Sequence, residues 1–206
     1  MVVTKITAQQ RNQNRVNVFI DTHYALSLTL DQLLAEKLKI GTVLSDADVK
    51  KLLKLSEDGK LRARALEWVL LRPRSAKELK TYLMKKQADA SLMQSIMDEF
   101  ARKRYQDDES FARWWVDNRV RKNKSNIAIQ SELTQKGIAR SIADAALSQS
   151  GTQKERLRAL VIQKKRVAKY KSDPTKFKRF LLGKGFRYSD IDEVLGDAID
   201  ADDGND

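Results

Sequence analysis

The most reactive pattern in this sequence is a pair of adjacent carboxylates, Asp107 and Asp108. In nucleases, carboxylates of this kind hold a divalent metal or exchange a proton. Adjacent side chains on a helix point in different directions, however, and no third ligand type lies nearby in the sequence. Both residues also precede a periodic run, where carboxylates stabilise the positive end of a helix. We therefore predict that they cap a helix, and a nuclease is the weaker alternative.

Other forms of catalysis lack the residues that they need. The chain has no Cys, which excludes disulfides and thiolate chemistry. His23 is the only His, so neither a His-based triad nor a multi-His metal site can form. We expect His23 to lie at the surface, in a turn. The sequence thus predicts a protein that is not an enzyme and that uses no cofactor and no metal.

The chain is strongly basic, with a net charge of +12 over 206 residues. Eight of its 28 acidic residues lie between Asp190 and Asp206, a stretch without Lys or Arg. The rest of the chain therefore sets 20 acidic residues against all 40 basic ones. Such a body attracts polyanions, so nucleic acid or an acidic protein surface is the expected partner. A purely solubilising role for the charge is the alternative.

The basic residues gather in clusters, which are the candidate binding residues. If the clusters line one concave surface, they would follow a phosphate backbone or the acidic patches of a protein polymer. The alternative for each cation is a solvated helix face. The candidates for contact with a partner or with nucleic acid are Arg102, Lys103, Arg104, Arg113, Arg119, Arg121, Lys122, Lys124, Lys164, Lys165, Arg166 and Lys169.

The N-terminal part of the chain carries the strand signals. Residues 3 to 29 alternate between apolar and polar side chains and predict a hairpin with its turn at residues 21–23. Residues 5–8 are a candidate third strand. A helix is then expected from Thr29 or Asp31 to Leu38, and Ser45 or Asp46 opens another. A boundary is expected at residues 56–59, which contain Ser, Asp and Gly.

From Lys60 onward only helix patterns remain, and they recur. Lys86 and Lys136 are 50 residues apart, and Lys184 follows 48 residues later. We predict three tandem three-helix repeats that form an elongated, curved array. Gly follows the second and third Lys and suits the left-handed conformation after a helix, whereas Gln87 would adopt it at some cost. The recurring motifs are Leu83-x-x-Lys86-Gln87, Leu133-x-x-Lys136-Gly137 and Leu181-x-x-Lys184-Gly185.

These patterns predict a mainly α fold with a small N-terminal module of a β-hairpin and helices. In the second repeat, Phe111, Trp115 and Val116 share one helix face. Trp114 and Trp115 cannot both face one core, so we expect one in the core and the other in a partial interface. The predicted segments are the module at 1–57, the repeats at 58–104, 105–150 and 151–199, and an acidic tail at 200–206.

Several ordered motifs resemble the bacterial RecX family. The N-terminal part, from Arg15 to Asp21 and from Tyr24 to Ser27, is similar to that of longer members from Gram-positive bacteria. Gln106 and Gln87 depart from the family, which usually has an apolar residue and Gly there. The motifs of the helical part are Arg72-Pro73-Arg74-Ser75-x-x-Glu78-Leu79, Tyr105-x-Asp107-Asp108-x-x-Phe111-Ala112, and Glu132-Leu133-x-x-Lys136-Gly137-Ile138.

The resemblance implies a regulator of the RecA recombinase, active in homologous recombination, DNA repair and the SOS response. Members of the family bind the RecA filament on single-stranded DNA, lie in its groove, and suppress ATPase and strand exchange; some also bind DNA directly. Capping of the filament and coating of its groove both stay open. A general DNA-binding protein that acts without RecA is the alternative.

We expect a cytoplasmic monomer. No apolar run is long enough to span a bilayer, and the first residues lack the apolar core of a signal peptide. Tandem repeats satisfy one another's apolar faces, and no heptad pattern indicates a coiled coil.

Overall fold

The structure is a computed structural model that describes residues 1–10 and 12–203; the side chains of residue 169 and residues 198–203 lie outside the description. The chain forms two compact units. We call Met1–Arg72 with Lys80–Tyr105 the N-terminal unit, and Pro73–Leu79 with residues 106–203 the C-terminal unit. Each unit is described separately below.

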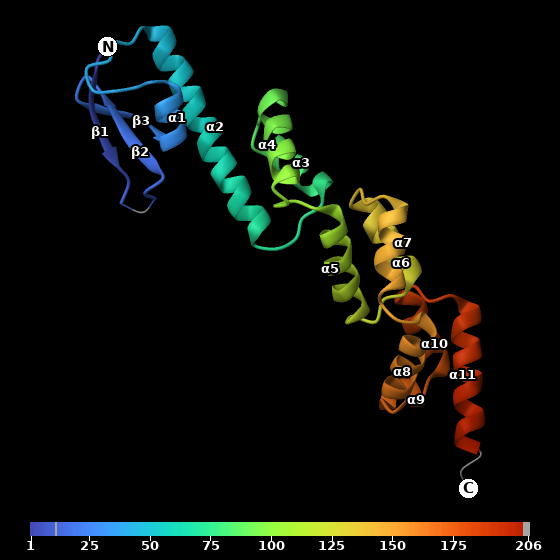
Figure 1. The fold of residues 1–206 in the computed structure, drawn as a ribbon. Helices are drawn as coiled ribbons and strands as arrows, with labels where there is room; N and C mark the ends of the chain where they lie inside the picture. The colour runs from blue at the N-terminus through green and yellow to red at the C-terminus, as the bar shows by residue number, and fades with distance from the viewer. Residues whose placement is uncertain (11, 204–206) are drawn as a thin grey trace. The chain divides into compact units, whose positions relative to one another are not determined.

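An antiparallel sheet of three strands opens the N-terminal unit: β1 (Val3–Ala8), β2 (Arg15–Ile20) and β3 (His23–Thr29), in the order β1-β2-β3. Figure 1 shows the three strands side by side. The predicted hairpin and third strand are therefore confirmed, and His23 is exposed as expected. One sheet face packs into a core that includes Val16, Val18, Leu26 and Leu28.

Two helices follow the sheet: α1 (Leu30–Ala35) and α2 (Asp46–Leu70). Thr29 and Ser45 cap them, each in a complete capping box. The expected continuation of the first helix to Leu38 is wrong. Lys37 has a φ of +51°, and Leu38 N–H turns back to donate to Leu33 O at 3.2 Å, so the helix closes at Ala35.

The boundary expected at residues 56–59 does not interrupt the helix, because α2 continues through it. Ser56 Oγ donates to Ser27 O at 2.7 Å and accepts from Ser27 N–H at 3.3 Å, which satisfies the edge of β3. Gly59 is buried, and a Cβ on it would lie 2.9 Å from Gln32 Nε2. These small residues therefore allow close packing and do not end the helix.

The second half of α2 packs with α3 (Ala76–Lys85) and α4 (Ala90–Arg102). Val69, Leu83, Ile96 and Phe100 are buried there. Trp68 on α2 stacks on Tyr82 of α3, with ring centroids 4.6 Å apart and planes at 14°. The first turn of α3 belongs to the C-terminal unit.

The C-terminal unit continues with α5 (Asp108–Val120), α6 (Asn126–Gln135) and α7 (Arg140–Ser148). Phe111, Val116, Ile129 and Leu133 are buried in their shared core. The expectation that Trp114 and Trp115 divide into one core and one interface residue is wrong. Both are partly buried and both pack against this core.

The remaining elements are α8 (Gln153–Lys165), α9 (Ala168–Lys171), α10 (Pro174–Gly183) and α11 (Tyr188–Asp203). Asp173 caps α10, and Pro174 fills its first turn, where a missing N–H costs nothing. Leu157, Leu160, Phe177 and Leu181 are buried in their core. The predicted mainly α fold with a small N-terminal β module is confirmed, and the exact limits of the repeats stay a prediction. The side chains of the predicted acidic tail, 200–206, lie outside the described residues.

Candidate functional site

In the C-terminal unit, a buried serine at the start of a helix twice donates to a main-chain oxygen at the end of a helix about 60 residues later. Ser75, the residue before α3, donates from Oγ to Lys136 O at the end of α6, at 2.8 Å. Ser125, which caps α6, donates from Oγ to Gly185 O just after α10, at 2.6 Å. Both serines are fully buried. The start of one helix is thus fixed to the end of the corresponding helix in the next group.

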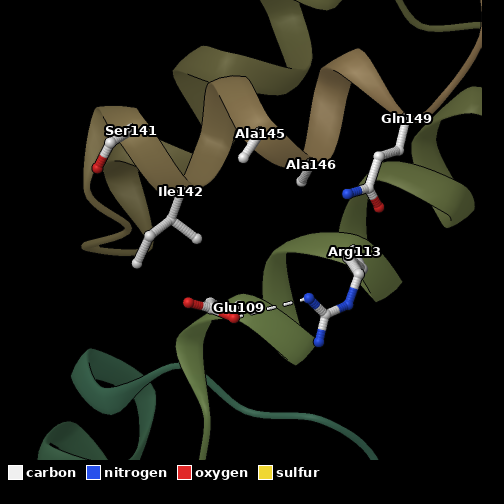
Figure 2. A pocket seen from close by; sticks show the side chains of 7 residues that line it. All are labelled: Glu109, Arg113, Ser141, Ile142, Ala145, Ala146 and Gln149. Atoms are coloured by element: carbon white, nitrogen blue, oxygen red, sulfur yellow. Dashed lines mark ion pairs between the residues drawn. The ribbon is translucent and has the colours of Figure 1, made fainter.

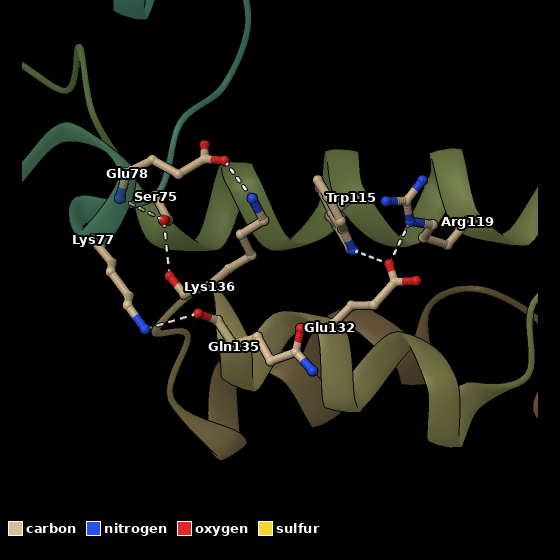
Figure 3. Close-up of polar contacts among 8 residues, drawn as sticks. All are labelled: Ser75, Lys77, Glu78, Trp115, Arg119, Glu132, Gln135 and Lys136. Carbon is tan, nitrogen blue, oxygen red and sulfur yellow. Dashed lines mark hydrogen bonds and ion pairs between the residues drawn. The ribbon is translucent and has the colours of Figure 1, made fainter. Parts of the chain in front are cut away.

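At the first junction, charges are balanced by carboxylates, as Figure 3 shows. Lys136 Nζ donates to Glu78 at 2.8 Å and lies 5.2 Å from the centre of the Trp115 ring. Arg119 lies 4.1 Å from the same ring and pairs with Glu132, which also accepts from Trp115 Nε1 at 2.9 Å. Two cations therefore contact one indole ring, and each has its own carboxylate.

The second junction repeats this geometry without the acid. Lys184 occupies the position of Lys136, but Ala128 stands where the first junction has Glu78. Lys184 Nζ instead donates to Lys122 O at 3.1 Å and lies 5.5 Å from the Phe180 ring centre. The cation is therefore brought next to the α5–α6 turn, which is itself basic.

We call Arg121, Lys122, Lys124 and Lys184 the junction cluster. Arg121 and Lys122 are exposed, and Lys124 and Lys184 are partly buried. Within the described part of the chain, none of these four side chains pairs with a carboxylate. Four neighbouring positive charges without counter-ions favour an anionic partner, since contacts of this kind release bound counter-ions.

Comparison with known proteins then decides the family. The chain is 34% identical to the regulatory protein RecX of Bacillus pumilus over 204 residues, which cover 96% of this chain and 78% of that relative. The chain belongs to the RecX family. It is also 30% identical to the regulatory protein RecX of Clostridium acetobutylicum, with 94% of both chains covered.

Family models and solved structures agree with this assignment. Residues 1–45 match the regulatory protein RecX N-terminal domain, and residues 107–147 match the second three-helix domain of RecX. A crystal structure of regulatory protein RecX has the same fold, with a TM-score of 0.72, 23% identity, and coverage of 95% of this chain and 98% of that one. RecX from Lactobacillus salivarius gives 0.58 at 24% identity, over 68% of this chain and 96% of that one.

Several of the predicted binding residues have partners within this RecX-family chain, among them Arg119 and Lys103. Arg119 is held by Glu132 and Trp115, as described above. Lys103 pairs with Glu99 at 2.8 Å and lies 5.9 Å from the Tyr105 ring centre. Arg119 joins α5 to α6, and Lys103 pairs with a residue of α4, so both are weaker candidates for a partner than the junction cluster.

The basic residues on either side of Lys103 are exposed to solvent. Arg102, in the last turn of α4, and Arg104, which has a φ of +55°, are both exposed. They belong to the N-terminal unit, whereas the junction cluster belongs to the C-terminal unit.

Arg113 lines a shallow pocket of about 330 Å³ between α5 and α7 (Figure 2). Its guanidinium donates to Ser110 Oγ at 3.1 Å and lies 3.8 Å from Glu109. The floor is formed by Ile142, Ala145 and Ala146. An exposed pair at this distance contributes little free energy.

The last predicted cluster lies at the end of α8. Lys164 and Lys165 are partly buried, Arg166 is exposed, and the Lys169 side chain lies outside the described residues. Elsewhere the acidic residues of α11 pair with the basic residues of this part. Arg158 meets Asp197 at 2.7 Å, Lys178 meets Asp192 at 2.6 Å, and Lys154 meets Glu193.

The acidic pair has the predicted capping role. Asp107 accepts from the N–H groups of Glu109 and Ser110 at the start of α5. Asp108 Oδ1 accepts from Ala76 N–H at 2.8 Å, at the start of α3. In the described residues, no group of three His, Cys, Asp or Glu could hold a metal ion. No helix there has the length and apolar character needed to cross a membrane.

Lys184 is the residue of the cluster that sequence reasoning missed as a binding candidate. It appeared only as the third member of a repeated motif. The sequence did contain a signal for Lys184: the first repeat has Glu78 where the second has Ala128, so Lys184 loses the carboxylate that Lys136 has. This signal can be read only once the structure shows that the start of α3 contacts the end of α6 and that the start of α6 contacts the end of α10.

Proposed function

We propose that this RecX-family chain binds the RecA filament on single-stranded DNA and restrains its ATPase and strand exchange, without catalysing a reaction itself. Family membership supports a regulatory role. The junction cluster is the observation that supports an anionic polymer as the partner, because its four cations lack carboxylate partners within the described part of the chain.

A filament offers the same surface many times, so contacts of moderate strength add through effective concentration. The serine contacts between the helical groups favour this mode of binding, because they hold basic residues of different helices at fixed spacing. The protein would then act as a clamp that resists the ATP-driven rearrangement of the filament.

The test is the RecA ATPase rate on single-stranded DNA, titrated with this protein at fixed salt, with binding to naked DNA measured in parallel. Inhibition below the concentrations that saturate naked DNA supports the filament as target. Inhibition that appears only as the DNA becomes covered would instead indicate a DNA-binding protein that acts without RecA.

The variant for this test is the combined change of Arg121, Lys122 and Lys124 to Glu. It should shift inhibition to higher protein concentration by at least about tenfold, since contacts to several phosphates or carboxylates would be lost. Changing Lys50, Arg64 and Lys80 to Glu is the matched control, because these exposed residues give the same change in net charge. Equal effects of both triple variants would contradict a role for the junction cluster.

A further inference from the structure

The sheet of the N-terminal unit has a second face that the core does not use. The register places Lys5, Phe19 and Tyr24 in one row across β1, β2 and β3, and Thr7, Asn17 and Ser27 in the next, where Ser27 is buried. The alternating neighbours, such as Val18 and Leu26, are buried in the core. We call the face that carries Lys5, Thr7, Asn17, Phe19 and Tyr24 the outer face.

The aromatic rings of this row are open to solvent. Tyr24 is 54% exposed, although a large ring usually gains by burial, and Phe19 is partly exposed. The two rings meet edge to face, with centroids 6.0 Å apart and planes at 80°. Lys5 Nζ lies 5.7 Å from the Phe19 centroid. An exposed ring, a partly exposed ring and a cation therefore lie side by side on this face of the sheet.

The surroundings favour an anionic partner with hydrogen-bonding groups. Residues 1–29 contain three basic residues and one acidic residue, Asp21. The Asp21 carboxylate already accepts from Val2 N–H at 2.8 Å. Beside the rings, Gln9 Nε2 donates to Asn17 Oδ1 at 2.8 Å, so amide groups that can pair with bases line the same surface.

We propose that the outer face binds single-stranded DNA, with Tyr24 and Phe19 stacking on unpaired bases and Lys5 contacting a phosphate. Aromatic side chains on a sheet stack on bases of any sequence, and nearby cations follow the backbone. A duplex would hide the base faces, which is why a single strand is the expected form. This site goes beyond the proposed function, because it requires no RecA and lies in the other unit from the junction cluster.

The test uses the full chain without RecA and a fluorescently labelled oligothymidylate, with affinity measured by anisotropy. Tyr24→Ala should weaken binding by about tenfold or more, the usual loss when one stacked ring is removed. Tyr24→Phe, which keeps the ring, should stay within about twofold of the parent protein. Tyr188→Ala is the matched control, because Tyr188 has a similar exposure of 57% on α11 and should change nothing.

Lys5→Gln gives a second measurement. It should lower the salt dependence of binding by about one counter-ion, since one phosphate contact is lost. Circular dichroism should be unchanged in all variants, because the three substituted side chains are exposed.

Unchanged oligothymidylate affinity in Tyr24→Ala would overturn the proposal, as would equal losses in Tyr24→Ala and Tyr24→Phe. A Tyr24-dependent affinity for duplex equal to that for single strands would overturn it too. Loss of RecA inhibition in Tyr24→Ala with full oligothymidylate affinity would identify a protein contact instead. Because the parent protein's effect on RecA ATPase is measured separately, failure here leaves the proposed function standing.

Discussion

The hydroxyl of Ser125 donates a 2.6 Å hydrogen bond to the main-chain oxygen of Gly185, 60 positions along the chain. Gly185 has a φ of +90°, and a Cβ added to it would lie 2.7 Å from both Ser125 Oγ and Ala128 Cβ. Glycine is therefore required for two reasons at this position: the left-handed backbone and the close approach of the start of α6.

Gly137 at the first junction is required for the same two reasons as Gly185, whereas Gln87, in the first repeated motif, meets only one of these demands. Gly137 has a φ of +81°, and a Cβ there would lie 3.0 Å from Lys77 Cβ. Gln87, at the corresponding position after α3, has a φ of +60° but is exposed. A side chain is tolerated at Gln87 because it is exposed, so the left-handed backbone is its only cost. This explains why the chain can depart from Gly at this position.

Gly185→Ala should lower the free energy of unfolding by about 2–5 kcal/mol, because backbone strain and overpacking act together. Gly151→Ala is the matched control: its φ is +76°, but nothing lies within 4 Å of the added Cβ. The control should lose only about 1–2 kcal/mol, the cost of the left-handed backbone. Urea unfolding followed by circular dichroism measures both, and equal losses would show that the close contact contributes nothing.

Ala128→Glu should give Lys184 the carboxylate that Glu78 gives Lys136 at the first junction. Stability should change by less than about 1 kcal/mol, because Ala128 and Lys184 are only partly buried and the pair stays in reach of solvent. Inhibition of RecA ATPase should require more protein, because one cation of the junction cluster is then neutralised. The measurement is the ATPase titration described above.

The control for that change is Ala159→Glu, which adds the same charge at an exposed position of α8. It should leave inhibition close to that of the parent protein. If both variants weaken inhibition equally, net charge and not the position of Lys184 determines binding.

Phe111→Ala should lower the free energy of unfolding by about 3–5 kcal/mol, because Phe111 is fully buried in the core of α5, α6 and α7. Its ring packs on Trp115, with centroids 5.5 Å apart. Tyr188→Ala, at an exposed ring, should change stability by less than about 0.5 kcal/mol. A neutral shift in the unfolding midpoint for Phe111→Ala would contradict its place in the core.

Elements of the fold could be predicted where residues close together in the sequence determine them. The alternation in β2 and β3 and the caps at Thr29, Ser45 and Asp107 all follow from neighbouring residues. The continuation of α2 through Gly59 could not be predicted, because the reason is the close approach of Gln32 from another helix.

The candidate site was predictable in part for the same reason. Clusters of Lys and Arg are visible in the sequence, but their partners are not. Arg119 has a carboxylate and an indole ring beside it, whereas among the described residues Lys184 has a carbonyl and a ring but no carboxylate. Which cations stay available depends on contacts between repeats about 50 residues apart, which composition and spacing do not contain.

Asp107 gives the last prediction, which concerns pH. Ser110 Oγ donates to its carboxylate at 2.6 Å, and this bond, followed by the N–H groups of Glu109 and Ser110, holds the pKa of Asp107 below its usual range. The unfolded chain, with an Asp pKa of about 3.9, takes up this proton first as the pH falls. The stabilisation is therefore fully present above about pH 4–5 and is lost as the pH falls through the lower folded pKa.

Asp107→Asn should keep the cap, because an amide oxygen also accepts from the helix N–H groups, but it cannot titrate. Its free energy of unfolding should depend less on pH below about pH 5, where first the unfolded and then the folded chain would take up the proton of Asp107. Ser110→Ala, which removes the main cause of the lowered pKa, should flatten the same profile partially. Urea unfolding at a series of pH values measures this, and parallel profiles for all three proteins would contradict it.

The same Asp107→Asn protein also tests the nuclease alternative. If the parent protein cleaves DNA in the presence of a divalent metal and Asp107→Asn does not, Asp107 has a catalytic role.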